Sequence, residues 1–340
     1  MLNKRPNTLI LIGLTASLGL SSCGGGSSSN NTTNDNNTTD SETQTIDSAA
    51  SICNGQNNFE NIPSAYVTAL TKYTTTNSQY LVNVCTQDIN SDGSADFIVV
   101  ESTNLPEHES VYYETGHQHQ EDFDFETNIH KFSPVYDGSQ TAHSAGSNMI
   151  EEQAIIMKMP IAPASATIKT ATTFATIGIA LNGVSFFNEN AAPGDNITDE
   201  LFTFDQCSGH PQNTGIYHYH VDPVCLIRDL GGSIIDQANT EGDSVYTWIE
   251  DSGNNAGLLM GFLMDGFPVY GPVGSSETDC NSAAVPSIDS YNGHSHCTGD
   301  FSTAIYHYHL KTANIGGTDS SVFWITNQFY YGEPGEVSTN

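Results

Sequence analysis

Strand-length apolar runs, separated by turn residues, fill the second half of this 340-residue chain. Runs at 176–181, 258–264 and 322–331 are bounded by Gly, Pro, Asn and Asp. Runs of this length between such residues are typical of β-strands, and no long segment has the 3.6-residue period of an amphipathic helix. The pattern predicts a mostly β fold, either a sandwich or an irregular barrel with long loops.

The charge balance limits the partners of the chain. Lys and Arg total 8 and Asp and Glu total 39, so the formal net charge is −31 with His counted as neutral. Phosphate binding requires clustered cations, and so does docking on anionic lipid through a basic patch. We therefore expect no nucleic-acid partner, whereas a strongly negative protein attracts metal cations.

The first 22 residues have the features of a secretion signal. Lys4 and Arg5 form a basic start, and the apolar run at 9–20 is too short to span a bilayer comfortably. The sequence Leu20-Ser-Ser-Cys23 resembles the lipobox of bacterial lipoproteins. This resemblance implies cleavage before Cys23 and lipidation of its thiol, and an ordinary signal peptide with a chance Cys is the alternative.

The anchor and the tether define the expected organisation. Gly24 follows the Cys, which by analogy with Gram-negative lipoproteins implies an outer-membrane anchor, with the domain on the periplasmic or the cell-surface side. Residues 23–47 are rich in Gly, Ser, Asn and Thr, so we expect a flexible, disordered tether. A β-rich segment at 48–160 and a β region at 161–335 follow, and we expect them to pack together as one domain.

The cysteines point to an oxidising compartment. Without the lipidated Cys23 an even number remains, which in an exported chain suggests three disulfides. Sequence alone does not choose among the possible connectivities, and we expect sequence neighbours to pair. These pairs are Cys53–Cys85, Cys207–Cys225 and Cys280–Cys297. No two cysteines have CxxC spacing, so a metal site has to use His and carboxylates.

An acidic loop in the first half has the composition of a calcium site. Oxygen-bearing side chains alternate along residues 88–96, and Gly93 permits a sharp turn. Ca²⁺ requires such a density of oxygen ligands, and the spacing resembles the DxNxDGxxD loops of calcium-binding β repeats. The candidate ligands are Asp88, Asn90, Asp92, Ser94 and Asp96. The alternative is an acidic turn that binds nothing.

The sequence Ile-Tyr-His-Tyr-His occurs twice, at 216–220 and at 305–309. Because side chains alternate between the faces of a strand, the two His of each copy share one face and the Tyr share the other, which we expect to be core. Two imidazoles on one strand face are spaced to bind one metal ion. If the two copies face each other, four imidazoles converge. The expected ligands are His218, His220, His307 and His309.

Further residues can complete this site. A Gly-His pair precedes each copy and supplies His210 and His294, and His296 forms another His-x-His with His294. Asp265 lies in an Asp-Gly turn between the copies and is either a ligand or the carboxylate that orients a ligand His; a plain hairpin turn is the alternative. Imidazole ligands suit copper and zinc, and no Met cluster typical of a Cu(I) site occurs. The opposing interpretation is a hydrogen-bonded histidine core without metal.

These residues resemble the YHYH domain family of exported bacterial proteins. The resemblance rests on Cys207-Ser-Gly-His210-Pro, Tyr217-His-Tyr-His220, Asp265-Gly-Phe-Pro-Val-Tyr-Gly-Pro272, Tyr291-Asn-Gly-His294 and Tyr306-His-Tyr-His309. It extends from about residue 100 to residue 335 and does not include 46–99. It implies no particular reaction, so metal binding is inferred from the chemistry of the residues.

The sequence leaves three functions open. The first is a membrane-tethered extracytoplasmic protein that binds copper or zinc. The second is a metalloenzyme, hydrolytic or oxidative, which needs an open coordination position and a nearby acid or base. Asp265, Tyr217 and Tyr306 are candidates for that role, and no catalytic residue is assigned. The third is a surface module that binds a glycan or a protein, with the histidines and Ca²⁺ serving only structure.

Overall fold

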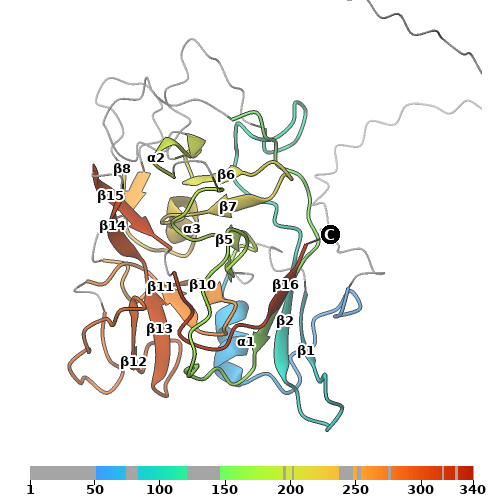
Figure 1. Ribbon diagram of the computed structural model, residues 1–340, viewed down its shortest axis with the longest axis vertical. Helices are drawn as coiled ribbons and strands as arrows, with labels where there is room; N and C mark the ends of the chain where they lie inside the picture. Colours follow the sequence, from blue (N-terminus) through green and yellow to red (C-terminus); the bar gives the residue numbers. More distant parts are fainter. Residues whose placement is uncertain are drawn as a thin grey trace, which may run out of the picture. The chain divides into compact units, whose positions relative to one another are not determined.

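An eight-stranded sheet dominates the second half of the chain (Figure 1). Its strand order is β12-β13-β11-β10-β4-β5-β7-β6. The order is linear, so the described strands form an open sheet and no closed barrel. The strands are β4 (Gly178–Ala180), β5 (Ser185–Phe186), β6 (Gly209–Pro211), β7 (Tyr217–Tyr219), β10 (Leu259–Leu263), β11 (Pro268–Tyr270), β12 (Gly293–His296) and β13 (Ile305–His309).

A four-stranded antiparallel sheet with the order β1-β2-β3-β16 brings the first half of the chain against the C-terminal end. Two strand pairs, β8–β9 and β14–β15, and three short helices complete the described elements, so the fold is mostly β, as predicted. The bounds are β1 (Asn83–Gln87), β2 (Phe97–Ser102), β3 (Ile155–Pro160), β16 (Glu336–Ser338), β8 (Ile234–Asp236), β9 (Trp248–Glu250), β14 (Lys311–Ile315), β15 (Thr318–Trp324), α1 (Ser64–Leu70), α2 (Ile197–Glu200) and α3 (Val224–Asp229).

This computed structural model describes residues 51–73, 83–120, 146–193, 197–200, 203–236, 248–250, 254–274, 277–315, 318–325 and 328–339. The expected signal at 1–22, the lipidation site Cys23 and the tether at 23–47 lie outside the described residues. The chain from Thr43 to Asn340 forms one compact unit. Within the described part, no helix is both long and apolar enough to cross a membrane.

One hydrophobic core connects the early part of the chain to the eight-stranded sheet. Tyr66 of α1 stacks on Phe262 of β10, with ring centroids 5.5 Å apart, and packs edge-on against Phe301. The Tyr66 hydroxyl donates a hydrogen bond to the Gly266 carbonyl at 2.9 Å. Aromatic rings bury a large apolar area each, so these contacts stabilise the packing of α1 on the sheet.

The buried carboxylate of Glu101 in β2 holds the beginning of the described chain. It accepts hydrogen bonds from the Ser51 hydroxyl at 2.9 Å, the backbone N–H groups of Ile52 and Cys53 at 2.6 and 3.0 Å, and the Asn83 amide at 2.8 Å. A buried carboxylate needs such partners to offset its desolvation. Residues 51–53 are thereby fixed to the four-stranded sheet.

Three disulfides staple the fold. They join Cys53 to Cys85, Cys207 to Cys225, and Cys280 to Cys297, which is the pairing of sequence neighbours that was expected. The first links the start of the described chain to β1, and the third closes the loop that leads into and out of β12. All three cross-links limit the freedom of the unfolded chain.

The eight-stranded sheet consists of two halves with the same topology. In one half the hairpin β4–β5 precedes the hairpin β6–β7, and β5 pairs in parallel with β7. In the other half β10–β11 precedes β12–β13, and β11 pairs in parallel with β13. The halves meet where β4 pairs with β10. The two histidine-bearing hairpins therefore lie at opposite edges of the sheet (Figure 1).

Candidate metal centres

The two histidine-bearing hairpins share one register. His210 of β6 lies opposite His218 of β7, and His294 of β12 lies opposite His307 of β13. Because β7 and β13 alternate Tyr and His, their tyrosines enter the core and their histidines face the other side. Each hairpin therefore gathers histidines from two adjacent strands on one face.

Glycine precedes the first histidine of each hairpin for a steric reason. A Cβ atom on Gly209 would lie 2.4 Å from the ring of Tyr217, and one on Gly293 would lie 2.4 Å from the ring of Tyr306. Any larger residue would collide with the first tyrosine of the Tyr-His-Tyr-His sequence. The Gly-His pair and the tyrosines are thus parts of one packing unit.

In each hairpin, an aspartate binds the hydroxyl of the first tyrosine of the Tyr-His-Tyr-His sequence. The Asp205 carboxylate accepts a hydrogen bond from the Tyr217 hydroxyl at 2.8 Å, and the Asp289 carboxylate accepts one from Tyr306 at 3.0 Å. The same carboxylate oxygens also accept backbone N–H groups of the turn before the Gly-His pair. The two hairpins therefore repeat a common framework for holding histidines.

The first cluster contains His210, His218 and His220, all of them buried. The Nε2 atom of His218 lies 3.1 Å from that of His210 and 3.0 Å from that of His220. Two imidazole nitrogens bound tetrahedrally to one ion at about 2.0–2.1 Å lie about 3.3 Å apart, which is close to these separations. The Glu200 carboxylate of α2 lies farther out, 3.5 Å from His220 and 3.7 Å from His210.

Outer contacts determine which nitrogen of each imidazole carries the hydrogen. The Nδ1 atom of His218 lies 3.0 Å from the Ile216 carbonyl, and that of His220 lies 2.5 Å from the Asn188 carbonyl. A carbonyl only accepts, so Nδ1 carries the hydrogen in both rings and a neutral ring presents a lone pair at Nε2. The Nε2 lone pairs therefore face one another at hydrogen-bond distance, which is unfavourable unless a cation lies between them.

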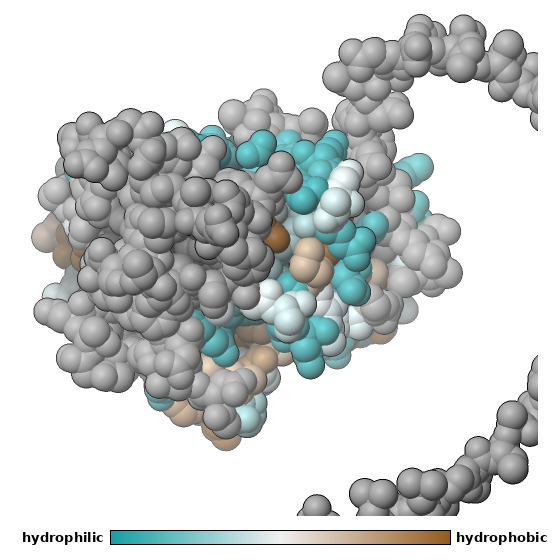
Figure 2. Space-filling model, turned by 90° about the horizontal axis from the view of Figure 1, so that it is seen from above, coloured by the Kyte–Doolittle hydropathy of each residue, from teal (hydrophilic) through white to brown (hydrophobic). Residues whose placement is uncertain are grey.

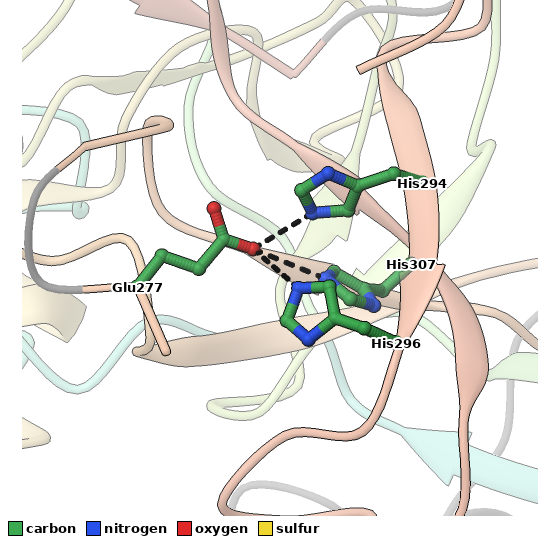
Figure 3. Close-up of side chains that lie close together, drawn as sticks. All are labelled: Glu277, His294, His296 and His307. Atoms are coloured by element: carbon green, nitrogen blue, oxygen red, sulfur yellow. Dashed lines mark hydrogen bonds and ion pairs between the residues drawn. The ribbon is translucent and has the colours of Figure 1, made fainter. Parts of the chain in front are cut away.

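The second cluster has four imidazoles and one carboxylate. Glu277 Oε1 lies 2.7 Å from His294 Nε2, 2.8 Å from His296, 3.0 Å from His309 and 3.4 Å from His307. Figure 3 shows three of these rings, from β12 and β13, pointing at the same carboxylate oxygen. The other carboxylate oxygen, Oε2, is buried with no hydrogen-bond partner among the described residues.

All four imidazoles of the second cluster have Nδ1 against a backbone carbonyl. The carbonyls belong to Pro286 for His294, Cys297 for His296, Ile305 for His307 and Gly271 for His309, at distances of 2.6, 2.7, 3.1 and 2.6 Å. The same hydrogen placement therefore applies, and four Nε2 lone pairs point toward a carboxylate that also only accepts. Carbonyl contacts of this kind orient metal-binding histidines.

Burial lowers the pKa of histidines in both clusters. It lowers the pKa of His220 and of His307 to about 4, and it holds the pKa values of His210 and His218 well below the ordinary value. Burial also opposes protonation of His294, but the nearby Glu277 carboxylate outweighs it and raises the pKa. A proton on His294 satisfies only one of the contacts to Glu277, so the other Nε2 atoms still lack a positive partner.

Burial would raise the pKa of Glu277, but contacts with His294, His307 and His309 hold it well below its usual range. This carboxylate is therefore ionised at neutral pH. An anionic oxygen surrounded by imidazole nitrogens is a donor set that suits Zn²⁺ or Cu²⁺.

The structure separates the two Tyr-His-Tyr-His copies. His218 and His220 join His210, whereas His307 and His309 join His294. The copies do not face each other, so the alternative of four imidazoles converging from both strands is wrong. The sequence indicates which residues share a face of one strand, but it does not give the order of the strands. That order depends on pairing between distant segments.

Asp265 does not reach either cluster. Its carboxylate accepts hydrogen bonds from the Tyr308 hydroxyl at 2.5 Å and from the Gly332 backbone N–H at 2.8 Å. Tyr308 is on the opposite face of β13 from His307 and His309, so Asp265 supports the tyrosine core. Burial raises the pKa of Asp265 to about 6.

Sequence reasoning missed the two carboxylates of the clusters, Glu200 and Glu277. Glu277 lies three residues before Cys280, and the Cys280–Cys297 disulfide closes its loop onto β12. An acidic residue so close to a bridged cysteine was the available signal. His296, expected to join or support the site, lies within the second cluster.

The acidic loop satisfies its own carboxylates. Asp88 accepts backbone N–H groups of Ser91 and Gly93 at 2.7 and 2.9 Å, and Asp96 accepts that of Ile89 at 2.8 Å. Among the described residues, Asp88, Asp92 and Asp96 do not form a group whose ligand atoms lie within 4.8 Å of one another. Calcium binding by this loop stays a prediction.

His108 lies near Cys207 and Cys225, but these cysteines form a disulfide and cannot act as thiolate ligands. His108 instead contacts the Asp205 carboxylate at 3.2 Å and the Tyr217 hydroxyl at 3.1 Å. It therefore belongs to the framework that holds the first hairpin.

The fold and the sites define a disulfide-stapled, mostly β protein with two buried histidine clusters that can hold metal ions. Residues 156–291 match the family model described as YHYH protein, so the chain contains a YHYH domain. The match includes the first Tyr-His-Tyr-His copy and Glu277 but ends before the second copy. No curated protein and no solved structure matches the chain.

Proposed function

We propose that this protein binds a transition metal, copper or zinc, through its buried histidine clusters, outside the cytoplasm and tethered to the outer membrane. The observation that carries the metal proposal is the second cluster. Four imidazole Nε2 atoms surround one carboxylate oxygen, and each ring has its Nδ1 against a carbonyl.

A polar core without metal accounts poorly for this arrangement. Such a core would place a hydrogen between each pair of polar atoms, because buried groups left unpaired cost about 1–3 kcal/mol each. Here only acceptors converge when the rings are neutral, and a proton on His294 would satisfy only its own contact with Glu277. A cation at the centre turns each of these lone pairs into a ligand.

The proposed location rests on the sequence and on the cysteines. Residues 1–22 have the pattern of a lipoprotein signal and end before Cys23. Three disulfides are typical of a protein that folds in an oxidising compartment. The net charge of −31 also favours accumulation of cations around the protein.

The described surface gives less support to a glycan-binding or protein-binding module. Among the described residues the large exposed apolar side chains are Ile89, Ile168, Phe174, Val273 and Phe329, and of these Ile168, Phe174 and Phe329 lie on two segments that pair through the Ala171–Phe329 bridge. On the face shown in Figure 2, hydrophilic and apolar residues both lie at the surface of the coloured part. The seven histidines of the two clusters are buried, so they do not form a binding surface.

Elemental analysis tests the metal proposal. The exported chain is purified without a chelator or a His tag, and its copper and zinc are counted per chain. The double variant His294→Ala/His307→Ala should lose the metal of the second cluster, whereas His119→Ala, outside both clusters, should keep the full content. Circular dichroism would show whether each variant keeps its fold. No transition metal in wild type, even after loading at neutral pH, would refute the proposal.

A further inference from the structure

The two histidine clusters occupy equivalent places in the repeated halves of the sheet, yet their ligand sets differ. In the second hairpin, His296 lies opposite Ile305. The equivalent position in the first hairpin is Gln212, whose backbone N–H donates to the Ile216 carbonyl at 3.1 Å. The first cluster therefore lacks the fourth imidazole at the one position where the framework would supply it.

Gln212 does not substitute for this imidazole. Its side-chain amide donates a hydrogen bond to the Thr214 hydroxyl at 2.9 Å, within the exposed turn. The contacts of the Gln212 side chain thus lie in the turn, whereas His296 Nε2 approaches the central carboxylate at 2.8 Å.

The carboxylates of the two clusters, Glu200 and Glu277, also differ in their distance from the imidazoles and in their exposure. Glu277 Oε1 lies within 3.0 Å of three imidazole nitrogens, and the side chain is 5% exposed. Glu200 lies 3.5 and 3.7 Å from two nitrogens of the first cluster, and its side chain is 23% exposed. The Glu200 carboxylate therefore lies farther from its imidazole nitrogens than Glu277 does, and it is more exposed to solvent.

The number of protein ligands determines whether a metal site can bind a further ligand. A site with four or more protein ligands is closed, whereas three protein ligands leave a position for water or another small ligand. The first cluster supplies three nitrogens, and His210, at 8% exposure, is its most exposed histidine.

We propose that the three-histidine cluster of His210, His218 and His220 holds its metal ion with an open coordination position and takes a small anion or water from solvent as an exchangeable ligand. The four-histidine cluster with Glu277 holds its ion closed. This inference rests on the proposed metal binding. It assigns different roles to the two clusters: a closed site that retains an ion and an open site at which a ligand can be exchanged.

Azide binding to the Cu²⁺-loaded chain tests the inference. The exported chain is loaded with Cu²⁺, and azide is added while the electron paramagnetic resonance spectrum and the visible absorption are recorded. We expect two bound Cu²⁺ ions, one for each cluster, with azide changing the signal of one ion only. The double variant His218→Ala/His220→Ala should lose that responsive signal and keep the other.

The internal repeat provides a second variant that does not truncate a buried ligand. Gln212→His places a fourth imidazole at the position equivalent to His296 and should abolish the azide response while both ions stay bound. The reverse exchange, His296→Gln, leaves Glu277 in place and should keep the wild-type response. These variants keep the experiment decisive if the alanine variant does not fold.

The outcomes separate the two proposals. If no Cu²⁺ binds at either cluster, the proposed function itself fails. If both ions bind but azide changes both signals, neither signal or only that of the four-histidine cluster, metal binding stands and the open-site inference is overturned. Persistence of the azide response in Gln212→His would also overturn it.

Discussion

At the scale of single residues, backbone carbonyls set the chemistry of the clusters. Six of the seven clustered histidines have Nδ1 against a backbone carbonyl, and His210 has the Thr203 hydroxyl instead, at 2.6 Å. Their Nε2 atoms are therefore available as ligands in the neutral ring. Burial keeps most of these rings neutral, which favours metal over protons as the cationic partner.

Removing the charge of Glu277 should weaken metal binding at the second cluster. Glu277→Gln keeps the size of the side chain but replaces an anionic oxygen in contact with four imidazoles by a neutral amide. We expect the affinity to fall by about 10–100-fold or more, since loss of even an outer carboxylate has an effect of this size. Competition with a chelator of known affinity measures the change.

Glu336→Gln is the matched control for this experiment. Glu336 is 74% exposed and pairs with Lys158 on the surface, so its replacement should leave the metal affinity unchanged. An equal affinity in wild type and Glu277→Gln would show that the carboxylate is not a partner of the metal.

Asp265 should make stability depend on pH. Burial raises its pKa from 3.8 to about 6 in the folded protein, so the folded state binds a proton more readily than the unfolded state between these values. The stabilisation of the folded state by protonated Asp265 is fully present below pH 3.8 and is lost as the pH rises through about 6. The loss is about 3 kcal/mol of unfolding free energy.

Chemical denaturation at several pH values checks this expectation. Asp265→Asn imitates the protonated group and should remove the part of the pH dependence that falls between pH 4 and pH 7. If wild type and variant show parallel pH profiles in this range, Asp265 does not titrate with a raised pKa.

At the scale of elements, the register of the two repeated hairpins determines which histidines lie together. The alternation of Tyr and His predicted which side chains share a face, and the structure confirms a tyrosine core behind each histidine pair. The distribution of the histidines over two clusters could not be predicted, because it depends on β4 pairing with β10 at the centre of the sheet. For Glu277 the only sequence signal was its closeness to Cys280, because a loop residue has no periodic pattern that gives the direction of its side chain.

Gly293→Ala should test the packing unit of the second hairpin. The new Cβ would lie 2.4 Å from both the Tyr306 ring and the His307 carbonyl oxygen. Overpacking of this kind costs about 1–3 kcal/mol or more, and here it would also displace His294. The midpoint of denaturant unfolding and the metal content should both fall.

Gly299→Ala provides the comparison, because a Cβ there would meet no atom within 4 Å. It should change the unfolding midpoint by no more than a surface substitution does. A similar loss in both variants would indicate a general effect of removing glycine and not a collision with Tyr306.

At the scale of the whole molecule, three short cross-links and one shared core hold long loops around two sites. The mostly β class followed from short runs and turn residues, and the disulfide pairs followed from sequence proximity. Calcium binding by residues 88–96 stays a prediction, and in the structure the carboxylates of Asp88 and Asp96 accept backbone N–H groups of the loop itself.

The proposed lipid anchor predicts a change of compartment. Cys23→Ser removes the only thiol that the lipobox pattern offers for lipidation, so the chain should move from the membrane fraction to the soluble fraction. Phase separation in a mild detergent measures this shift, and Cys53→Ser, which leaves Cys23 intact, should remain with the membrane. Equal partitioning of wild type and Cys23→Ser would contradict the anchor.

The hydrogen bonds between the Glu101 carboxylate and residues 51–53 have a mechanical consequence. If the proposed tether holds the protein by its N-terminal segment, a pull on that tether is passed along the chain to these residues. The load is then shared by several hydrogen bonds to one buried carboxylate and by the covalent Cys53–Cys85 link to β1. Under that proposal, among the described elements the four-stranded sheet would take the force before the histidine-bearing edges of the larger sheet.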